Sequence, residues 1–508
     1  MSFKSYDQQQ LMLLPPSFDE LIPPKDPVRV VNEIVERLDL SSVYAQYKKL
    51  GCASYHPKMM IKIIIYAYLR NIYSSRKIED ITANDIRFIW LSGMQRPDHN
   101  TINTFRSSKL KGTLKEVFAQ MVHFMVEEKM VSLENAYTDG TKIEANANRY
   151  TFVWGRSIQT RIGKIADQIN ALWDYAESVT KEELSDKTPV THQDITSEKI
   201  TGLVEKIDQA LSGVEIDKKV KDKIKRIKKS WPEQVKRYED QGAQMGERSS
   251  MSKTDCDATF MRMKEDHMGN GQLKPAYNIQ ISTENGIITN YTSHQTTTDT
   301  TTYQEHMQEY HRLHGFYPTN SICDAGYGSE ENYLFAQENE ITPYIKYNYF
   351  HKEQTKNWKN NPFLSSNFYY NEQKDCCYCP MGQEMVKIGQ KRERTRTGFL
   401  QISSLYKAKR CTSCPLRGSC HQSKGERIIQ INHRLKELKK WAKELLMSKQ
   451  GLHHRSQRPA DVEQTFGNLK ANKLFKRFLL RGLKKVEVEF GLLSIAHNIS
   501  KLAIKQAI

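Results

Sequence analysis

The stretch KPAYNIQISTENGIITNYTSH, residues 274–294, carries a clear strand signal in this chain. Two runs of alternating apolar and polar residues flank Glu284, Asn285 and Gly286. An Asn-Gly pair between two such runs is typical of a tight β-hairpin turn. The stretch therefore predicts two antiparallel strands joined by a turn at these three residues.

The segments on either side of this hairpin predict the rest of a layered fold. Upstream, LENAYTDGTKIEANAN (133–148) resembles a strand that leads up to Asp139. Downstream, helix and strand signals alternate, and one strand is expected to end at Asp324. This order is that of an α/β fold, in which carboxylates at strand ends commonly form the site. The downstream elements are expected at 301–314 (helix), 320–324 (strand), 329–339 (helix) and 341–347 (strand).

The charge balance points to a polyanionic partner. The formal net charge of the chain is +17, which favours nucleic acid or an anionic membrane surface. A membrane is the weaker choice, because the most apolar run, MMIKIIIYAYL (59–69), is too short to span a bilayer and carries Lys62. The N-terminus shows no secretory signal pattern, so we expect a cytoplasmic protein whose nine cysteines are reduced rather than bridged.

A chain of 508 residues is expected to contain several domains or large insertions, since single cores usually stop growing well below this length. Residues 1–130 predict a helical module of helix-turn-helix type, in which Asp98 or Asn100 is an N-cap. Residues 131–508 predict the α/β part, with a charged helical hairpin inserted at about 156–245 and a Cys-rich segment at about 370–425. The basic run DKKVKDKIKRIKKSW (217–231) suits either a solvated helix face or contact with DNA.

Two acids open a segment that is otherwise basic, RPADVEQTFGNLKANKLFKRFLLRG (458–482). Asp461 fits a helix-capping role, because carboxylates near a helix N-terminus meet the positive end of its dipole. Glu463 and Lys470 are seven residues apart and share one helix face, beyond the reach of the usual intrahelical ion pair. That spacing suits a metal ion and a phosphate bound along one line. Taken locally, Asp139 before Gly140 and Asp324 before Ala-Gly are also ordinary turn residues.

Several motifs together resemble those of DDE transposases encoded by bacterial insertion sequences. They are YTDGTKIEANAN (137–148), CDAGYGSEENY (323–333), VEQTFGNLKANKLFKRFLLRG (462–482) and KVEVEFGLLSIAHNISKL (485–502). In addition, HPKMMIKIIIYAYLRNIYSSRKIE (56–79) and PDHNTINTFR (97–106) resemble the helical domain that precedes the catalytic domain in one branch of these enzymes. The resemblance covers most of the chain, apart mainly from the first residues and the helical insertion.

The resemblance implies a ribonuclease-H-like mixed-sheet core whose three acids hold Mg²⁺ or Mn²⁺. Carried over residue by residue, these acids are Asp139, Asp324 and Glu463, and the Lys on the face of that Glu is Lys470. One departure concerns the Arg that related enzymes place four residues before the Glu, since that position is Pro459 here. Arg458 and Arg455 are the nearest arginines and leave the role open.

The chemistry explains why such residues are needed. Cleavage of a phosphodiester develops negative charge on the attacking and leaving oxygens, which two metal ions can stabilise. Mg²⁺ takes oxygen ligands and retains several waters, so a few carboxylates suffice. Other acids and histidines near the expected strands are assigned to turns, hydrogen bonds or packing: Glu144, Asp255, Asp257, His267, His294 and His497.

The cysteines of DCCYCPMG (375–382) and CTSCPLRGSC (411–420) predict a small zinc subdomain, because paired Cys motifs suit a tetrahedral Zn²⁺ site. Resemblance to patterns of related enzymes favours Cys379, Cys411, Cys414 and Cys420 as the ligands. Three other residues could replace one of these ligands. The alternative is that the cysteines are buried thiols that bind no metal. The substitutes are Cys376, Cys377 and, more distantly, His421.

We therefore expect a transposase that binds the terminal inverted repeats of its element, cuts DNA with divalent metal and joins the 3′ ends to target DNA. A nuclease that does not join ends, or a DNA-binding protein without turnover, are the alternatives. The N-terminal domain is expected to read the repeats in the major groove, and the alternative is that its helices only pack or dimerise. The active species is expected to be a homodimer or higher oligomer on DNA, associated with the bacterial nucleoid. The expected DNA contacts are Arg106, Arg458, Lys470, Lys473 and Arg477.

Overall fold

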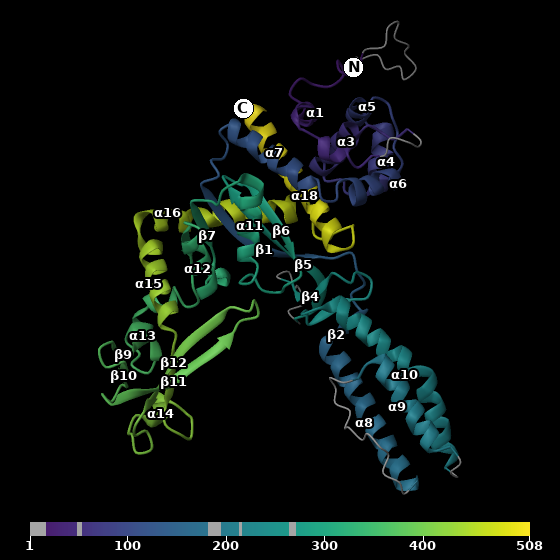
Figure 1. The fold of residues 1–508 in the computed structure, drawn as a ribbon. Coiled ribbons are helices and arrows are strands. Elements are labelled where there is room, and N and C mark those ends of the chain that lie inside the picture. The colour runs from purple at the N-terminus through teal and green to yellow at the C-terminus, as the bar shows by residue number, and fades with distance from the viewer. Residues whose placement is uncertain (1–16, 48–52, 181–194, 213–215, 264–270, 508) are drawn as a thin grey trace, which may run out of the picture.

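The computed structural model describes residues 17–47, 53–180, 195–212, 216–263 and 271–507. At its centre lies a mixed six-stranded sheet (Figure 1). Its β1 strand is antiparallel to β5 and parallel to β7, and β7 is in turn parallel to β8. The strands are, in sheet order, β4 (Thr259–Arg262), β5 (Leu273–Glu284), β1 (Asn135–Glu144), β7 (Asn320–Cys323) and β8 (Thr342–Ile345), with β6 (Ile287–His294) also paired to β5.

The β5–β6 hairpin confirms the opening prediction. The two strands pair antiparallel, and Asn285 and Gly286 connect them with φ angles of 55° and 71°. A two-residue turn with both central residues at positive φ matches the right-handed twist of the flanking strands. The α/β class and mixed sheet are thus confirmed, and the strand arrangement is consistent with a ribonuclease-H-like core.

Helices cover both faces of this sheet, so that successive residues of β1 point into different environments. On one face, His306 of α11 (Tyr303–His314) contacts the Ser282 hydroxyl of β5. On the other face, His454 of α16 (Lys449–Arg458) contacts the Tyr137 hydroxyl of β1. Side chains alternate across a strand. Gly140 therefore faces the α11 side, and Asp139 faces the α16 side.

The N-terminal helices pack onto the end of the chain. In Figure 1, α3 (Pro57–Leu69) and α7 (Leu114–Glu127) lie beside α18 (Leu483–Ala507). A single core cluster runs from Ile22 to Leu502 and joins these helices to the sheet. The expected helix at 59–69 is confirmed as a buried one, and Asp98 caps α6 (His99–Thr104) by accepting a hydrogen bond from the Thr101 amide at 2.6 Å. A boundary near residue 130 stays a prediction.

The insertion is helical, as expected, but contains three described helices rather than two: α8 (Gly155–Thr180), α9 (Ser197–Ala210) and α10 (Lys218–Met245). It projects from the sheet in Figure 1 and has an apolar core of its own, built around residues such as Trp173 and Trp231. The remainder of this expected segment, 181–194 and 213–215, lies outside the described residues. Short strands β2 (Phe152–Trp154) and β3 (Ser250–Ser252) pair at its base.

The Cys-rich segment forms a second sheet of five antiparallel strands, below the core in Figure 1. In sheet order these are β13 (Ile428–Ile431), β12 (Leu400–Ala408), β11 (Glu384–Arg394), β10 (Cys376–Tyr378) and β9 (Tyr369–Asn371).

No helix of the described residues is both long and apolar enough to cross a membrane. The remaining helices are α1 (Pro27–Arg37), α2 (Ser41–Tyr44), α4 (Ser75–Asn84), α5 (Ile86–Ser92), α12 (Glu330–Glu338), α13 (Lys356–Lys359), α14 (Arg417–Cys420), α15 (His433–Met447) and α17 (Gln464–Gly467).

Candidate active site

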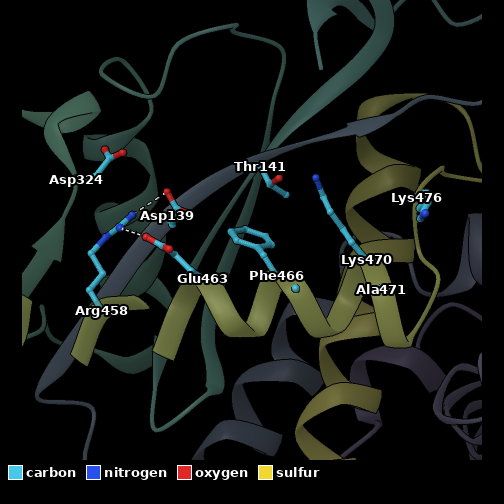
Figure 2. A pocket seen from close by; sticks show the side chains of 10 residues that line it. Asp139, Thr141, Asp324, Arg458, Glu463, Phe466, Lys470, Ala471 and Lys476 are labelled. Atoms are coloured by element: carbon cyan, nitrogen blue, oxygen red, sulfur yellow. Dashed lines mark hydrogen bonds and ion pairs between the residues drawn. The ribbon is translucent and has the colours of Figure 1, made fainter. Parts of the chain in front are cut away.

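Three separate elements bring the predicted acids to one pocket. Asp139 lies within β1, and Asp324 directly follows β7, the parallel neighbour of β1. Glu463 ends a short π-helix, Pro459–Glu463, that continues α16. All three line a pocket together with Arg458 and Lys470, as Figure 2 shows. The sequence-predicted acids are thus close together, although 324 positions separate the first from the last in the chain.

The strand and turn that carry the two aspartates are locally constrained. Asp324 accepts a hydrogen bond from the Gly326 amide at 2.8 Å and so caps a single 3₁₀ turn, Ala325–Tyr327. The Tyr327 hydroxyl donates to the side chain of Gln280, which is buried on β5 directly opposite Gly140. This contact links the turn after β7 to the strand pair that holds Asp139.

Replacing Gly140 by Ala tests this constraint. The new Cβ would lie 2.7 Å from Asp299 Oδ1 and closer still to Gln280 Nε2. These two side chains are hydrogen-bonded to each other, so they can give way only by breaking buried contacts. We expect a loss of about 1–3 kcal/mol of stability, as in other overpacked cores, and reduced cleavage. Thermal denaturation measures the former, with Gly242→Ala as the control. Gly242 lies inside α10 with no other part of the chain near its added Cβ, so this change should lose no stability and gain up to about 1 kcal/mol.

Arg458 stands between two of the acids. Its Nη2 atom lies 3.0 Å from Asp139 Oδ1, and its Nη1 atom lies 2.5 Å from Glu463 Oε1. Only 7% of the Arg458 side chain is exposed, whereas half of the Glu463 side chain is. Burial acts to lower the pKa of Arg458, but the carboxylates of Asp139, Asp324 and Glu463 outweigh it, and the pKa is raised. The guanidinium therefore remains charged.

The π-helix explains how Arg458 takes this place despite its unexpected spacing. The Gln464 amide donates to the Pro459 carbonyl, a bond between residues five apart. In a π-turn, residues i and i+5 therefore face the same way, as residues i and i+4 do in an α-helix. Arg458, five residues before Glu463, thus occupies the position that the resemblance assigned to Pro459. In this structure Arg458, rather than Arg455, is the arginine that pairs with the acids, and the role of the family's arginine stays a prediction for it.

Two lysines extend the positive lining of the pocket. Lys470 Nζ donates to the carbonyl of Lys142 at 3.3 Å, and the exposed Lys476 lines the same pocket. Lys346, just beyond the end of β8, has a pKa that is lowered by burial and by the nearby Arg458 and Arg455. Sequence reasoning missed Lys346 and Lys476. The position of Lys346 at the carboxyl end of a strand adjacent to β7 was the available signal.

Among the predicted DNA contacts, Arg106 and Lys473 are buried and Arg477 is exposed. Arg106 is wrong as a contact: it is 2% exposed and donates to the Tyr68 hydroxyl at 3.1 Å and the Tyr73 carbonyl at 2.7 Å. Lys473 is wrong for the same reason, since it is 6% exposed. Arg477 is exposed, although it donates to backbone carbonyls of the segment after β1, and it stays a prediction.

The neighbouring acids have structural partners, largely as expected. Asp461 accepts a hydrogen bond from the Gly286 amide at 2.9 Å and so holds the β5–β6 turn. The helix-cap role predicted for it is wrong, because the helical run already begins at Lys449. Asp255 accepts from the Tyr277 hydroxyl, Asp257 from the Leu483 amide, and Glu144 pairs with Arg149. His294 and His497 contact Thr292 and the Gly286 carbonyl, and His267 lies outside the described residues.

The donor set at the pocket suits a hard divalent cation. Within the described ranges, no three His, Cys, Asp or Glu side chains stand together as a ready metal-binding group. However, the carboxylates of Asp139 and Glu463 already share one cation, the Arg458 guanidinium. Carboxylate oxygens are the ligands that Mg²⁺ and Mn²⁺ prefer. The residues therefore fit such an ion, provided that the guanidinium makes room.

The four favoured cysteines line a separate small pocket, which His421 joins. Arg427 donates to Cys420 Sγ through Nη1 at 2.8 Å and to Cys411 Sγ through its amide at 3.4 Å. The His421 Nε2 atom is buried and has no hydrogen-bond partner. These donor types suit Zn²⁺, but among the described residues the cysteines do not stand together as a ready metal-binding group, so the zinc site stays a prediction. Cys376 and Cys377 lie on β10 and do not line this pocket.

Comparison with known families agrees with this picture. Residues 378–503 match the family described as a transposase DDE domain, and residues 16–108 match the one described as a transposase domain (DUF772). Both matches are to transposase families, and together they span less than half of the chain. More narrowly, they indicate a DDE transposase of an insertion-sequence type with an N-terminal transposase domain, which confirms the resemblance. No curated protein and no solved structure matched the chain.

Proposed function

We propose that this transposase binds the terminal inverted repeats of its element, cleaves DNA phosphodiester bonds with a divalent metal ion and joins the 3′ ends to target DNA. The observation that carries the proposal is the pocket lined by Asp139, Asp324 and Glu463 with Arg458 and Lys470 at its side. Acids from three elements that meet beside cations suit a metal-bound phosphate. They have no evident use in a protein that only binds DNA.

Each side chain has a proposed role in this pocket. Asp139, Asp324 and Glu463 hold Mg²⁺ or Mn²⁺, which when bound stabilises charge on the attacking and leaving oxygens and lowers the pKa of a water. Lys470, whose ammonium group reaches toward β1, holds a phosphate of the substrate near the acids. The exposed Lys476 and Arg477 extend this contact along the DNA backbone.

Recognition of the repeats is proposed to lie in the N-terminal helices. Because Arg106 is buried, the exposed Asn100 and Asn103 of α6 take over as the candidate base contacts. Asn side chains pair well with adenine in the major groove. The four cysteines are proposed to bind one structural Zn²⁺, and a homodimer or higher oligomer is proposed to act on DNA.

The function is tested by incubating the purified protein with Mg²⁺ and DNA that carries the repeats flanking its gene. Nicks at the repeat ends and covalent products joined to a second duplex support transposition. Nicks without joined products favour the alternative, a metal-dependent nuclease. Binding without any nick, in Mg²⁺ and in Mn²⁺, would contradict both and leave a DNA-binding protein without turnover.

DNA affinity is expected to depend steeply on salt. A protein with a net charge of +17 releases counterions from the phosphates that it covers. With 6–10 phosphate contacts, affinity should fall about 10³–10⁵-fold between 50 and 200 mM salt. Fluorescence anisotropy of a labelled duplex measures the slope. A flat response would show that phosphate contacts do not dominate the interface.

A further inference from the structure

Arg458 is more than a member of the pocket lining, because its guanidinium joins two of the acids directly. The two ion pairs, at 3.0 Å to Asp139 and 2.5 Å to Glu463, come from the two terminal nitrogens of one planar group. The third nitrogen, Nε, is buried and has no hydrogen-bond partner. Arg458 thus holds the acids firmly while one of its own donors remains unsatisfied.

This arrangement places a fixed positive charge where the two carboxylates need one. Asp139 is only 8% exposed, so water does little to stabilise its charge. Opposite charges at such distances attract strongly in a partly buried setting. Because Arg458 belongs to the same chain, this attraction acts at every metal concentration. A divalent ion that binds Asp139 and Glu463 must first separate them from the guanidinium.

We propose that Arg458 is an internal counter-cation that competes with the divalent ion for Asp139 and Glu463, and thereby keeps the metal affinity of the DNA-free protein low. The inference rests on the proposed metal-dependent function and adds a constraint to it. In the DNA-free protein Arg458 acts through the acids, as a positioning residue.

DNA offers the displaced guanidinium a new partner. Arg pairs with phosphate as readily as with carboxylate, through two parallel hydrogen bonds. The exposed side of Glu463 and the positions of Lys470 and Lys476 show that the pocket is open toward such a ligand. Metal and DNA should therefore bind with positive coupling, and this coupling is reciprocal.

The test measures Mn²⁺ binding without DNA by electron paramagnetic resonance and by calorimetry. Arg458→Gln removes the charge and is expected to bind Mn²⁺ at least about tenfold more tightly than the wild type. Arg458→Lys retains one charge but not the two-pronged geometry, so its affinity should lie between the two. Lys476→Gln removes a charge from the same pocket that pairs with neither acid, and should change the affinity far less.

Adding a duplex should increase the Mn²⁺ affinity of the wild type more than that of Arg458→Gln. The inference is overturned if Arg458→Gln binds Mn²⁺ no more tightly than the wild type and a folded Arg458→Lys variant does not bind it more tightly either. Arg458 would then only support the acids. Cleavage of repeat DNA by the wild type decides the proposed function separately. If the wild type cleaves repeat DNA while Arg458→Gln and Arg458→Lys bind Mn²⁺ with unchanged affinity, the proposed function is supported and only the proposed competition for the acids is excluded.

Discussion

Asp139→Asn, Asp324→Asn and Glu463→Gln are each expected to abolish DNA cleavage while DNA binding persists. Each change preserves size and removes one negative oxygen from the pocket that all three acids line. The acids are proposed to act as one unit, so the loss should be at least about a thousandfold, the scale seen when a member of an interdependent catalytic set is removed. Nicking of end-labelled repeat DNA in Mg²⁺, alongside a mobility-shift assay, measures both properties.

Asp461 supplies a matched control on the same helical segment. It lies two residues before Glu463 and holds the Gly286 amide through one oxygen, which Asn would retain. Burial, the main cause, raises the pKa of Asp461, although hydrogen bonds from Thr283 and from the Gly286 and Asn285 amides act to lower it. Asp461→Asn should fold and cleave nearly as well as the wild type. Wild-type nicking by a variant of Asp139, Asp324 or Glu463 would exclude that residue from the site.

The second large effect is expected at the cysteine pocket. Cys411→Ser or Cys414→Ser should release the proposed zinc and loosen the five-stranded sheet, whose core contains Cys411, Cys377 and Met385. Structural zinc contributes about 10–16 kcal/mol of apparent binding free energy in small zinc domains, so its loss should unfold this subdomain. Elemental analysis should find about one zinc per chain in the wild type and none in the variants.

Limited proteolysis locates the damage, because cleavage should concentrate within the Cys-rich sheet while the central core resists. Cys256→Ser is the control, since Cys256 is exposed and distant in sequence from the pocket residues. It should retain zinc and protease resistance. The proposal would be contradicted if the wild-type protein, purified without chelator, contained no zinc and its Cys-rich sheet resisted the protease as well as the central core does.

The sequence was sufficient for those elements whose causes are local. The β5–β6 turn follows from Asn285 and Gly286, and the start of α6 follows from the Asp98 side chain. The three acids were identified through their motif contexts, and the pocket indeed brings them together. The turn and the helix start depend on residues a few positions apart, whereas the acids were assigned from the resemblance to known transposases.

Other features depend on contacts between distant parts of the chain, which single motifs do not encode. Arg106 is of a residue type that often contacts DNA, yet it is buried and donates hydrogen bonds to Tyr68 and Tyr73. Lys473 is buried, and its carbonyl accepts a hydrogen bond from the Tyr73 hydroxyl, which is 400 positions away in the chain. Lys346 lies close enough to the site for Arg458 to lower its pKa, and the sequence did not reveal this because strand order, rather than sequence order, places β8 beside β7.

The π-turn at Pro459 has a consequence for how related proteins are found and aligned. An extra residue in an ordinary helix rotates everything beyond it by about 100°, which would turn Glu463 and Lys470 away from the strand that bears Asp139. Here the wide turn takes up the extra residue locally, so both sides of the helix retain their orientation. A helix of this kind can therefore accept an inserted residue without reorienting the glutamate and lysine that follow it. Signatures that require a fixed interval between the arginine and the glutamate would separate proteins with such a helix from their relatives.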